Sequence, residues 1–75
     1  MNLKVLAARK NARVTQVDLA VRAGIDKLGI ILIERYGWLP PKDIREKLAQ
    51  ELRTTEDALF GDALRDAASE HSHAR

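Results

Sequence analysis

The groups best suited to chemistry in this chain are the polar and cationic side chains of its first half, and that chemistry is contact with phosphate. Residues 1–35 hold seven Lys and Arg against three Asp and Glu, a net charge of +4, whereas residues 36–75 have a net charge of −2. Binding to a phosphate backbone needs such a localised positive charge. A solvated surface that is unevenly charged is the alternative explanation.

Catalysis is not expected. The chain has no cysteine, and it shows no Ser/His/Asp or Cys/His set, glycine-rich phosphate loop or carboxylate pair placed in a cleft. His71 and His73 lack a third ligand, so we expect no metal and no cofactor. The longest apolar run, from Leu28 to Ile33, has six residues and is too short to span a membrane. The N-terminus carries no signal-peptide pattern, so we expect a cytoplasmic protein.

Capping residues predict the elements that must position the polar groups. Asn2 can cap a helix that ends near Asn11. Thr15 precedes a second helix, and Asp18 follows three residues later as the partner in a capping box. Gly24 suits the left-handed residue that ends this second helix.

Propensity and context disagree about the next segment. The run Gly29-Ile-Ile-Leu-Ile33 is rich in β-branched residues and is typical of a buried strand. Asp26 is a natural N-cap, however, and the helices predicted on either side leave a strand without a partner. We therefore predict a helix at about residues 26–36.

The second half predicts a loop and two further helices. The loop spans residues 36–41, Pro41 suits the first turn of a fourth helix, and Thr55 can cap a fifth. Alanine and leucine after residue 62 favour one or two more turns, with fraying from residue 69. The predicted fold class is all-α: a compact five-helix domain over residues 1–61 and a short, partly helical C-terminal extension over residues 62–75.

Three sequence patterns occur together in the chain. They are Thr15-Gln-x-x-Leu-Ala-x-x-Ala-Gly-Ile25, Ile30-x-x-Ile-Glu34 and Leu52-x-x-x-x-Asp-x-Leu-Phe-Gly61. As a set they resemble the lambda-repressor-like (Cro/C1, XRE) DNA-binding family, over about residues 3–61. The resemblance implies a helix-turn-helix in residues 15–36, whose second helix enters the major groove of double-stranded DNA.

The resemblance also implies roles for individual residues. Gln16 matches the family residue that clamps a backbone phosphate, with an ordinary exposed glutamine as the alternative. Arg9 and Glu34 match a structural ion pair between the first and third helices. The predicted DNA-binding residues are Thr15, Gln16, Asp26, Lys27, Leu28, Ile31, Leu32, Arg35 and Lys42.

The predicted recognition helix departs from the family where it should face the bases. Family members carry polar residues there, because base identity is presented as a pattern of hydrogen-bond donors and acceptors. Here Leu28, Ile31 and Leu32 form an apolar face flanked by Lys27 and Arg35. Leu28 and Leu32 could contact thymine methyl groups while Lys27 reaches a guanine or a phosphate. Alternatively the face docks a protein, or the helix starts in a shifted register and buries it.

The loop departs as well, because Lys42 is its remaining cation, which predicts few phosphate contacts and a shallow salt dependence. Trp38 is expected either as a lid over the core beside the fourth helix or in a dimer contact. The resemblance implies a small sequence-specific transcriptional regulator, a homodimer on a pseudo-palindromic operator, with dimer contacts from the fifth helix, Leu64 and Trp38. A protein-interaction module on the same fold is the alternative.

Overall fold

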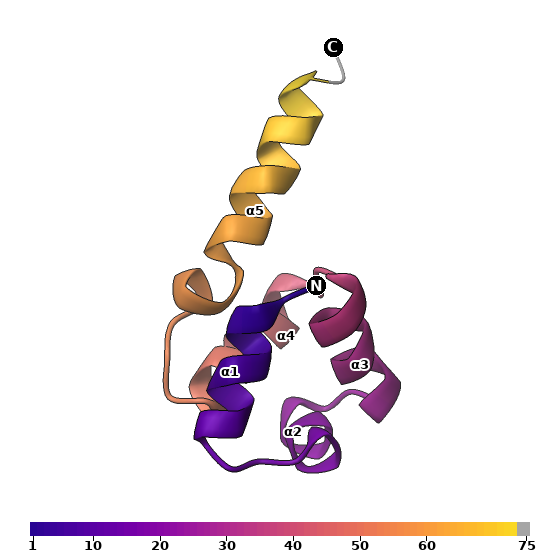
Figure 1. The fold of residues 1–75 in the computed structure, drawn as a ribbon, viewed down its shortest axis with the longest axis vertical. Helices are drawn as coiled ribbons and strands as arrows, with labels where there is room; N and C mark the ends of the chain where they lie inside the picture. Colours follow the sequence, from indigo (N-terminus) through magenta and orange to yellow (C-terminus); the bar gives the residue numbers. More distant parts are fainter. Residues whose placement is uncertain (74–75) are drawn as a thin grey trace.

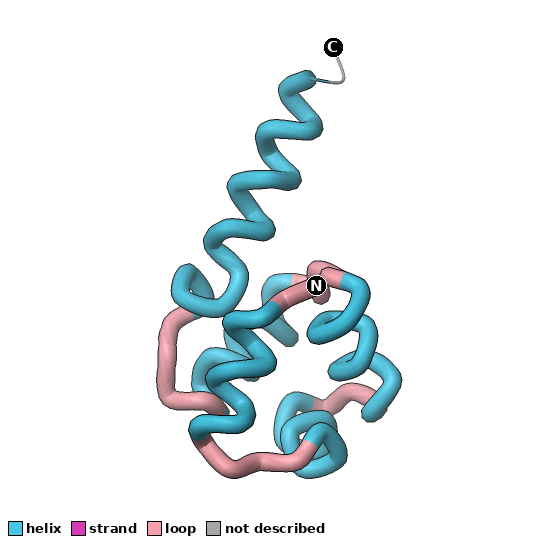
Figure 2. The backbone as a smooth tube through the Cα atoms, viewed as in Figure 1, coloured by secondary structure: helices cyan, strands magenta, loops and turns pink. Residues whose placement is uncertain are grey.

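The computed structural model describes residues 1–73, and side chains as far as residue 68, and it confirms the all-α fold class. Five helices and their connecting loops make up this part of the chain, which contains no strand (Figures 1 and 2). Their bounds are Leu3–Asn11 for α1, Gln16–Ala23 for α2, Lys27–Tyr36 for α3, Lys42–Glu51 for α4 and Glu56–His73 for α5. No helix in the described part is long and apolar enough to cross a membrane.

Capping contacts start the helices where the sequence predicts. The side chain of Asn2 accepts a hydrogen bond from the backbone N–H of Val5, and Thr15 Oγ1 accepts one from Asp18, each at 3.0 Å. The latter is one of the two bonds of the predicted capping box. Gly24 ends α2 with a φ of 74°, a left-handed conformation that favours glycine. These contacts fix the length of α2 and the turn into α3.

Two predicted caps differ in detail. Asp26 occupies the N-cap position of α3, but its side chain makes no capping hydrogen bond. Pro41 stands one residue before α4, at its N-cap, rather than inside the first turn. Both helices nevertheless start within one residue of the expected place.

The isoleucine-rich run is helical because the core needs it at helical spacing. Ile30 and Ile33 are fully buried, while Leu28 is 62% exposed. In a strand, residues three apart would point to opposite faces, whereas in a helix they share one. The remaining fully buried aliphatic and aromatic side chains are Val5, Leu19, Leu48 and Phe60, so helices α1 to α5 all contribute to a single core.

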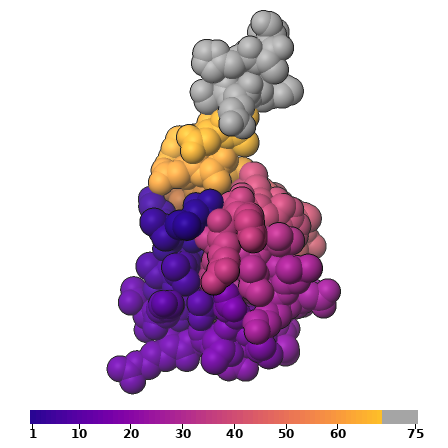
Figure 3. Space-filling model, turned by 45° about the vertical axis from the view of Figure 1, so that its right-hand side comes forward, coloured from indigo at the N-terminus to yellow at the C-terminus, as the bar shows by residue number. Residues whose placement is uncertain are grey.

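The last helix is longer than the sequence suggested. α5 continues through residues 61 and 62 to His73 as one helix, so no break marks the expected boundary of the C-terminal extension. Its first turns pack on α1 and α4 through Leu59 and Phe60. Leu64 still packs against the core, and the later turns extend beyond the other helices (Figure 1); in Figure 3 the orange and yellow part of α5 sits on top of the body. The fraying predicted from residue 69 is wrong as far as His73, because α5 is helical to that residue, and residues 74 and 75 lie outside the described residues.

Candidate nucleic-acid interface

A buried ion pair ties α1 to α3. Arg9 Nε donates to Glu34 Oε2 at 2.6 Å and Arg9 Nη2 donates to Glu34 Oε1 at 3.2 Å. A third donor, Arg9 Nη1, bonds the carbonyl of Val14 at 3.0 Å. Arg9 is 9% exposed and Glu34 only 3%. The structure therefore brings together the two residues that the family resemblance pairs, and the bidentate geometry fixes how α3 lies against α1.

Gln16 joins this pair, a contact that the sequence did not indicate. Its Nε2 donates to Glu34 Oε1 at 3.1 Å, which orients the amide because a carboxylate can only accept. The amide oxygen and the second N–H of this half-buried side chain remain available to a ligand. Gln16 is thus held in place at the first residue of α2, where the helix dipole and free backbone N–H groups favour an anion.

The turn between α2 and α3 is short and is closed by backbone hydrogen bonds. Beyond Gly24, the backbone N–H of Ile25 bonds the carbonyl of Ala20 at 3.0 Å, which closes the C-terminus of α2. Ala20 and Ala23 are buried. Their small side chains let α2 and α3 approach closely.

The outer face of α3 is exposed at its two ends and partly covered between them. Lys27, Leu28 and Arg35 are exposed, whereas Ile31 and Leu32 are half-buried. The shifted register considered above is wrong, because α3 begins at Lys27 directly after Asp26. Lys27 and Arg35 lie about 12 Å apart along the helix, given its rise per residue. Neither makes an ion pair with another described residue, so both charges are available to phosphate.

An open apolar groove runs along this face. It is lined by Gly24, Ile25, Asp26, Leu28, Gly29, Leu32 and Trp38. We call it the α3 groove. A Cβ on Gly29 would come to 3.0 Å from the side chain of Ile25, which is a tight contact, so the absence of a side chain at Gly29 lets Ile25 lie close against α3.

The position of Trp38 differs from one of the two predictions made for it, the lid over the core beside the fourth helix. Leu39, not Trp38, packs against the core, so Trp38 is not the lid over α4. Instead its ring forms a wall of the α3 groove and stays 41% exposed. Trp38 follows Gly37, the left-handed residue that ends α3, and its ring lies back along that helix near Gly29.

Two other predicted site residues lie at the edges of this surface. Thr15 is exposed and uses its hydroxyl to cap α2. Lys42 bonds Glu56 at 3.3 Å, in a cluster where Arg45 also donates to Glu56 at 2.7 Å. The Arg45 hydrogen bond, reinforced by Lys42, holds the pKa of Glu56 below its ordinary value. Because Glu56 partly neutralises Lys42, that cation is less available to phosphate than Lys27.

The sequence patterns did not point to one exposed cation that lies close to Gln16 along the chain. Arg13 follows α1 with a φ of 58°, in the left-handed position that glycine usually occupies. Its place in the turn before Thr15 puts a positive charge near the N-terminus of α2. The sequence signal was weak, because an arginine gives no indication of a left-handed turn.

Groups for metal binding are absent from the part of the chain that the structure describes, where no three His, Cys, Asp or Glu side chains cluster. His71 and His73 lie outside the described side chains.

Comparisons of this chain with protein-family models, curated proteins and solved structures found no match.

Proposed function

We propose that this chain binds double-stranded DNA through α2 and α3 as a small transcriptional regulator of the lambda-repressor-like (Cro/C1) type, with α3 in the major groove. The observation that carries the proposal is the pair of helices joined by the left-handed Gly24 and its short turn, with the charges of Lys27 and Arg35 unpaired on the exposed face of α3. A helix presented in this way can enter a major groove.

The proposed contacts divide into positioning and discrimination. Gln16, oriented by Glu34, and the N-terminus of α2 would bind a backbone phosphate. Lys27 would reach a phosphate or a guanine, and Leu28, the most exposed aliphatic residue of α3, a thymine methyl group. With so few polar groups facing the bases, we expect a preference for A·T pairs and modest sequence discrimination.

The test is a fluorescence-anisotropy titration with a random duplex library at about 50 and about 200 mM salt, followed by sequencing of the bound pool. We expect salt-dependent binding and an enriched pseudo-palindromic site. Replacing both Gln16 and Lys27 by alanine should weaken binding at least about tenfold and lower the salt slope by about 1 or more.

Lys47→Ala is the matched control, because Lys47 is an exposed lysine of α4 and is not one of the proposed DNA-binding residues. It should leave both affinity and slope unchanged. Absence of binding at the lower salt by a folded sample would refute the proposal.

A protein-docking role for α3 is the second candidate, favoured by the 62% exposure of Leu28 beside the α3 groove. Leu28→Ser together with Leu32→Ser separates the two roles. If α3 binds DNA, the variant keeps most of its salt-dependent affinity and loses its A·T preference. If α3 docks a protein, the unmodified chain shows no selective DNA binding, and the double substitution abolishes the protein complex.

A further inference from the structure

The α3 groove combines apolar walls with a single charged residue. Its large apolar side chains are those of Ile25, Leu28, Leu32 and Trp38, and Asp26 is the one lining residue that carries a charge. Leu28 and Leu32 are four residues apart on α3, so they share one face of the helix. The groove therefore offers an apolar surface and one acidic group to a ligand that approaches α3.

The apolar space of the groove lies over Gly29. A Cβ at this position would stand 3.0 Å from the side chain of Ile25 and 3.6 Å from the ring of Trp38. Carbon atoms in favourable contact are about 3.5–4.0 Å apart. Glycine is unfavourable inside a helix, yet here it leaves a space that Ile25 borders on one side and Trp38 on the other. A small apolar group from outside the chain suits this space.

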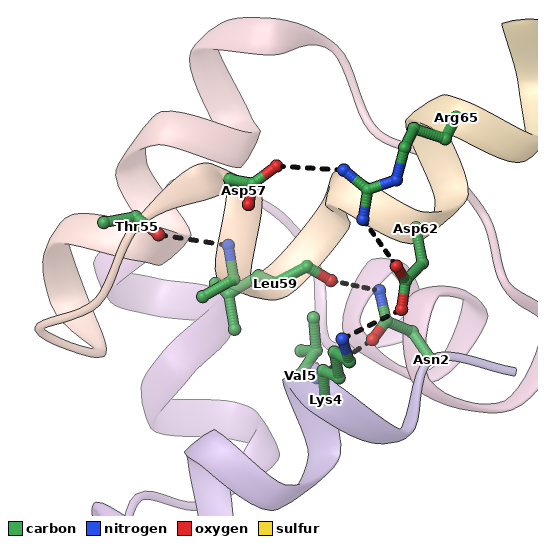
Figure 4. A network of polar contacts seen from close by, with 9 residues as sticks. Asn2, Lys4, Val5, Thr55, Asp57, Leu59, Asp62 and Arg65 are labelled. Carbon is green, nitrogen blue, oxygen red and sulfur yellow. Dashed lines mark hydrogen bonds and ion pairs between the residues drawn. The ribbon is translucent and has the colours of Figure 1, made fainter.

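The carboxylate of Asp26 has no partner among the described residues. It makes neither a capping hydrogen bond nor an ion pair. The backbone N–H of Gly29 donates to the carbonyl of Asp26 at 2.8 Å, so the acidic residue stands one helical turn from the apolar space. Charges at the root of α5 differ, because Lys4 lies 2.8 Å from Asp62 and Arg65 donates to Asp62 at 2.6 Å (Figure 4). Asp26 can therefore accept a hydrogen bond from a ligand.

The cations around the groove favour a polyanion as this ligand. Lys27 directly follows Asp26, and Arg35 lies two turns further along α3. Neither cation makes an ion pair with another described residue. Duplex DNA supplies phosphates on both sides of its major groove and base edges between them. The groups that can enter the α3 groove are then those of a base edge.

Base edges differ in the two features that the groove can recognise. A carboxylate can only accept, so it requires a donor on the base. Guanine presents acceptors, adenine and cytosine present an amino donor without a methyl group, and thymine presents a methyl group beside an acceptor. Methylation of cytosine at C5 places a methyl group beside the N4 amino donor. 5-Methylcytosine therefore combines the apolar group and the donor on adjacent ring atoms.

We propose that the α3 groove recognises 5-methylcytosine in the major groove of duplex DNA. The C5-methyl group lies over Gly29, between Ile25 and Trp38, and the N4 amino group donates to the carboxylate of Asp26. This site rests on the proposed function and deepens it by naming the base that α3 selects. Thymine carries the same methyl group, but its O4 acceptor faces Asp26 and disfavours it. In DNA without methylated cytosine, thymine is the remaining source of the methyl group, in agreement with the A·T preference expected above.

Duplexes that differ only in methyl groups test the site. Selection from a random library made with 5-methylcytosine in place of cytosine gives an enriched duplex. It is then synthesised in four forms, in which cytosine or 5-methylcytosine is combined with thymine or uracil. Fluorescence anisotropy at about 50 mM salt gives the four dissociation constants. We expect 5-methylcytosine to strengthen binding at least about fourfold over cytosine, with thymine and with uracil alike, because one methyl group is buried.

Asp26→Asn tests the acceptor. Asparagine keeps the N-cap position favourable, and its amide can also donate to the O4 atom of thymine. With thymine and 5-methylcytosine compared at the recognised position, we expect the preference for 5-methylcytosine to fall at least about threefold. Asp18→Asn is the matched control, because Asp18 is an exposed acid in the first turn of α2 and outside the groove. It removes the same charge and should leave the preference unchanged.

Gly29→Ala tests the apolar space by filling it with a methyl group of the chain itself. Alanine is the better helix former, so the variant should fold, which circular dichroism checks. We expect it to bind the cytosine form about as tightly as the unmodified chain does. The advantage of 5-methylcytosine over cytosine should fall below about twofold, because the space is then occupied.

Three outcomes would overturn this site in different ways. Equal affinity of the unmodified chain for all four forms would exclude a methyl site and leave the proposed function standing. A methyl effect confined to thymine would assign the groove to thymine instead. If the variants at Asp26 and Asp18 behave alike, Asp26 does not select the base. Absence of binding to every duplex would refute the proposed function, and this site with it.

Discussion

At the scale of single residues, the network of Arg9, Glu34 and Gln16 joins stability to the proposed function. Glu34 accepts two hydrogen bonds from Arg9 and one from Gln16, and it is almost fully buried. The same carboxylate therefore holds α3 on α1 and orients the amide at the N-terminus of α2. A change at Glu34 should affect both folding and phosphate contact.

Glu34→Ala is expected to destabilise the fold by about 3–5 kcal/mol, because Arg9 would remain buried without a counterion. Urea denaturation followed by circular dichroism measures this loss. Replacing both charges, with Arg9→Met and Glu34→Leu, should cost much less, because no unpaired charge then remains in the core. A loss below about 1 kcal/mol for Glu34→Ala would mean that the pair contributes little.

Glu56 gives the fold a pH dependence of known sign. The hydrogen bond from Arg45 holds its pKa below the ordinary value of 4.5 in the folded chain. The stabilisation is complete above the unfolded pKa and is lost as pH falls through the lowered folded value. Glu56→Gln should therefore flatten the decline in stability from about pH 5 to about pH 3.

Asp43→Asn is the control for that pH series, since Asp43 is exposed and forms no ion pair with any described residue. Its curve should follow that of the unmodified chain. Asp62 should contribute a pH dependence of the same sign as Glu56, because hydrogen bonds from Lys4 and Arg65 lower its pKa. Parallel curves for Glu56→Gln and the unmodified chain would contradict the assignment to Glu56.

At the scale of elements, two residues test how the helices end. Gly24 and Arg53 both have positive φ, 74° and 55°, at the ends of α2 and α4. A Cβ on Gly24 would meet no atom within 4 Å, so Gly24→Ala isolates the backbone cost. We expect a loss of about 1 kcal/mol for Gly24→Ala and a gain of about 0.5–1 kcal/mol for Arg53→Gly, by urea denaturation. Changes of the same sign would show that backbone conformation is not the deciding factor.

Local rules were sufficient for most element boundaries. Asn2, Thr15 and Gly24 act through bonds to residues near them in sequence, which is why caps and turns predicted α1 and α2. These local rules alone did not predict the α3 helix, because its β-branched residues favour a strand. The helix forms because residues at helical spacing can then be buried together in the core. The length of α5 could not be predicted because it depends on what stabilises an alanine-rich segment beyond the core.

The candidate site was less predictable than the fold. The pairing of Arg9 with Glu34 followed from the family resemblance, but the bond from Gln16 to Glu34 requires knowing that α2 begins beside the end of α3. Likewise the place of Trp38 near Gly29 follows from the turn at Gly37 that brings its ring back along α3, a contact that no periodicity contains. Long-range packing decides these positions, and a single sequence carries little signal for it.

At the scale of the whole molecule, two hollows lie at opposite ends of α3: the α3 groove, and a groove of mixed polar and apolar lining at the root of α5, the α5 groove. The α3 groove surrounds Leu28 and Gly29, whereas the α5 groove is bordered by Tyr36. A homodimer would hold two copies of α3 at a fixed separation. The half-sites of dimeric helix-turn-helix proteins are about 34–36 Å apart. The proposed function therefore predicts this separation for the two copies of α3.

Dimerisation should also appear in thermal stability. Because association stabilises the folded state by mass action, we expect the midpoint of thermal unfolding to rise with protein concentration. A midpoint that does not change with concentration in the unmodified chain would argue against a dimer in solution.

The distribution of aromatic side chains gives the protein two built-in optical reporters. The chain has a single tryptophan, Trp38, in the wall of the α3 groove, and a single tyrosine, Tyr36, beside the α5 groove. Indole emission shifts to the blue when water is removed from the ring, and a DNA base stacked on it quenches the emission. Tryptophan fluorescence can therefore report on occupancy of α3, and tyrosine absorption on association through α5, without any attached dye.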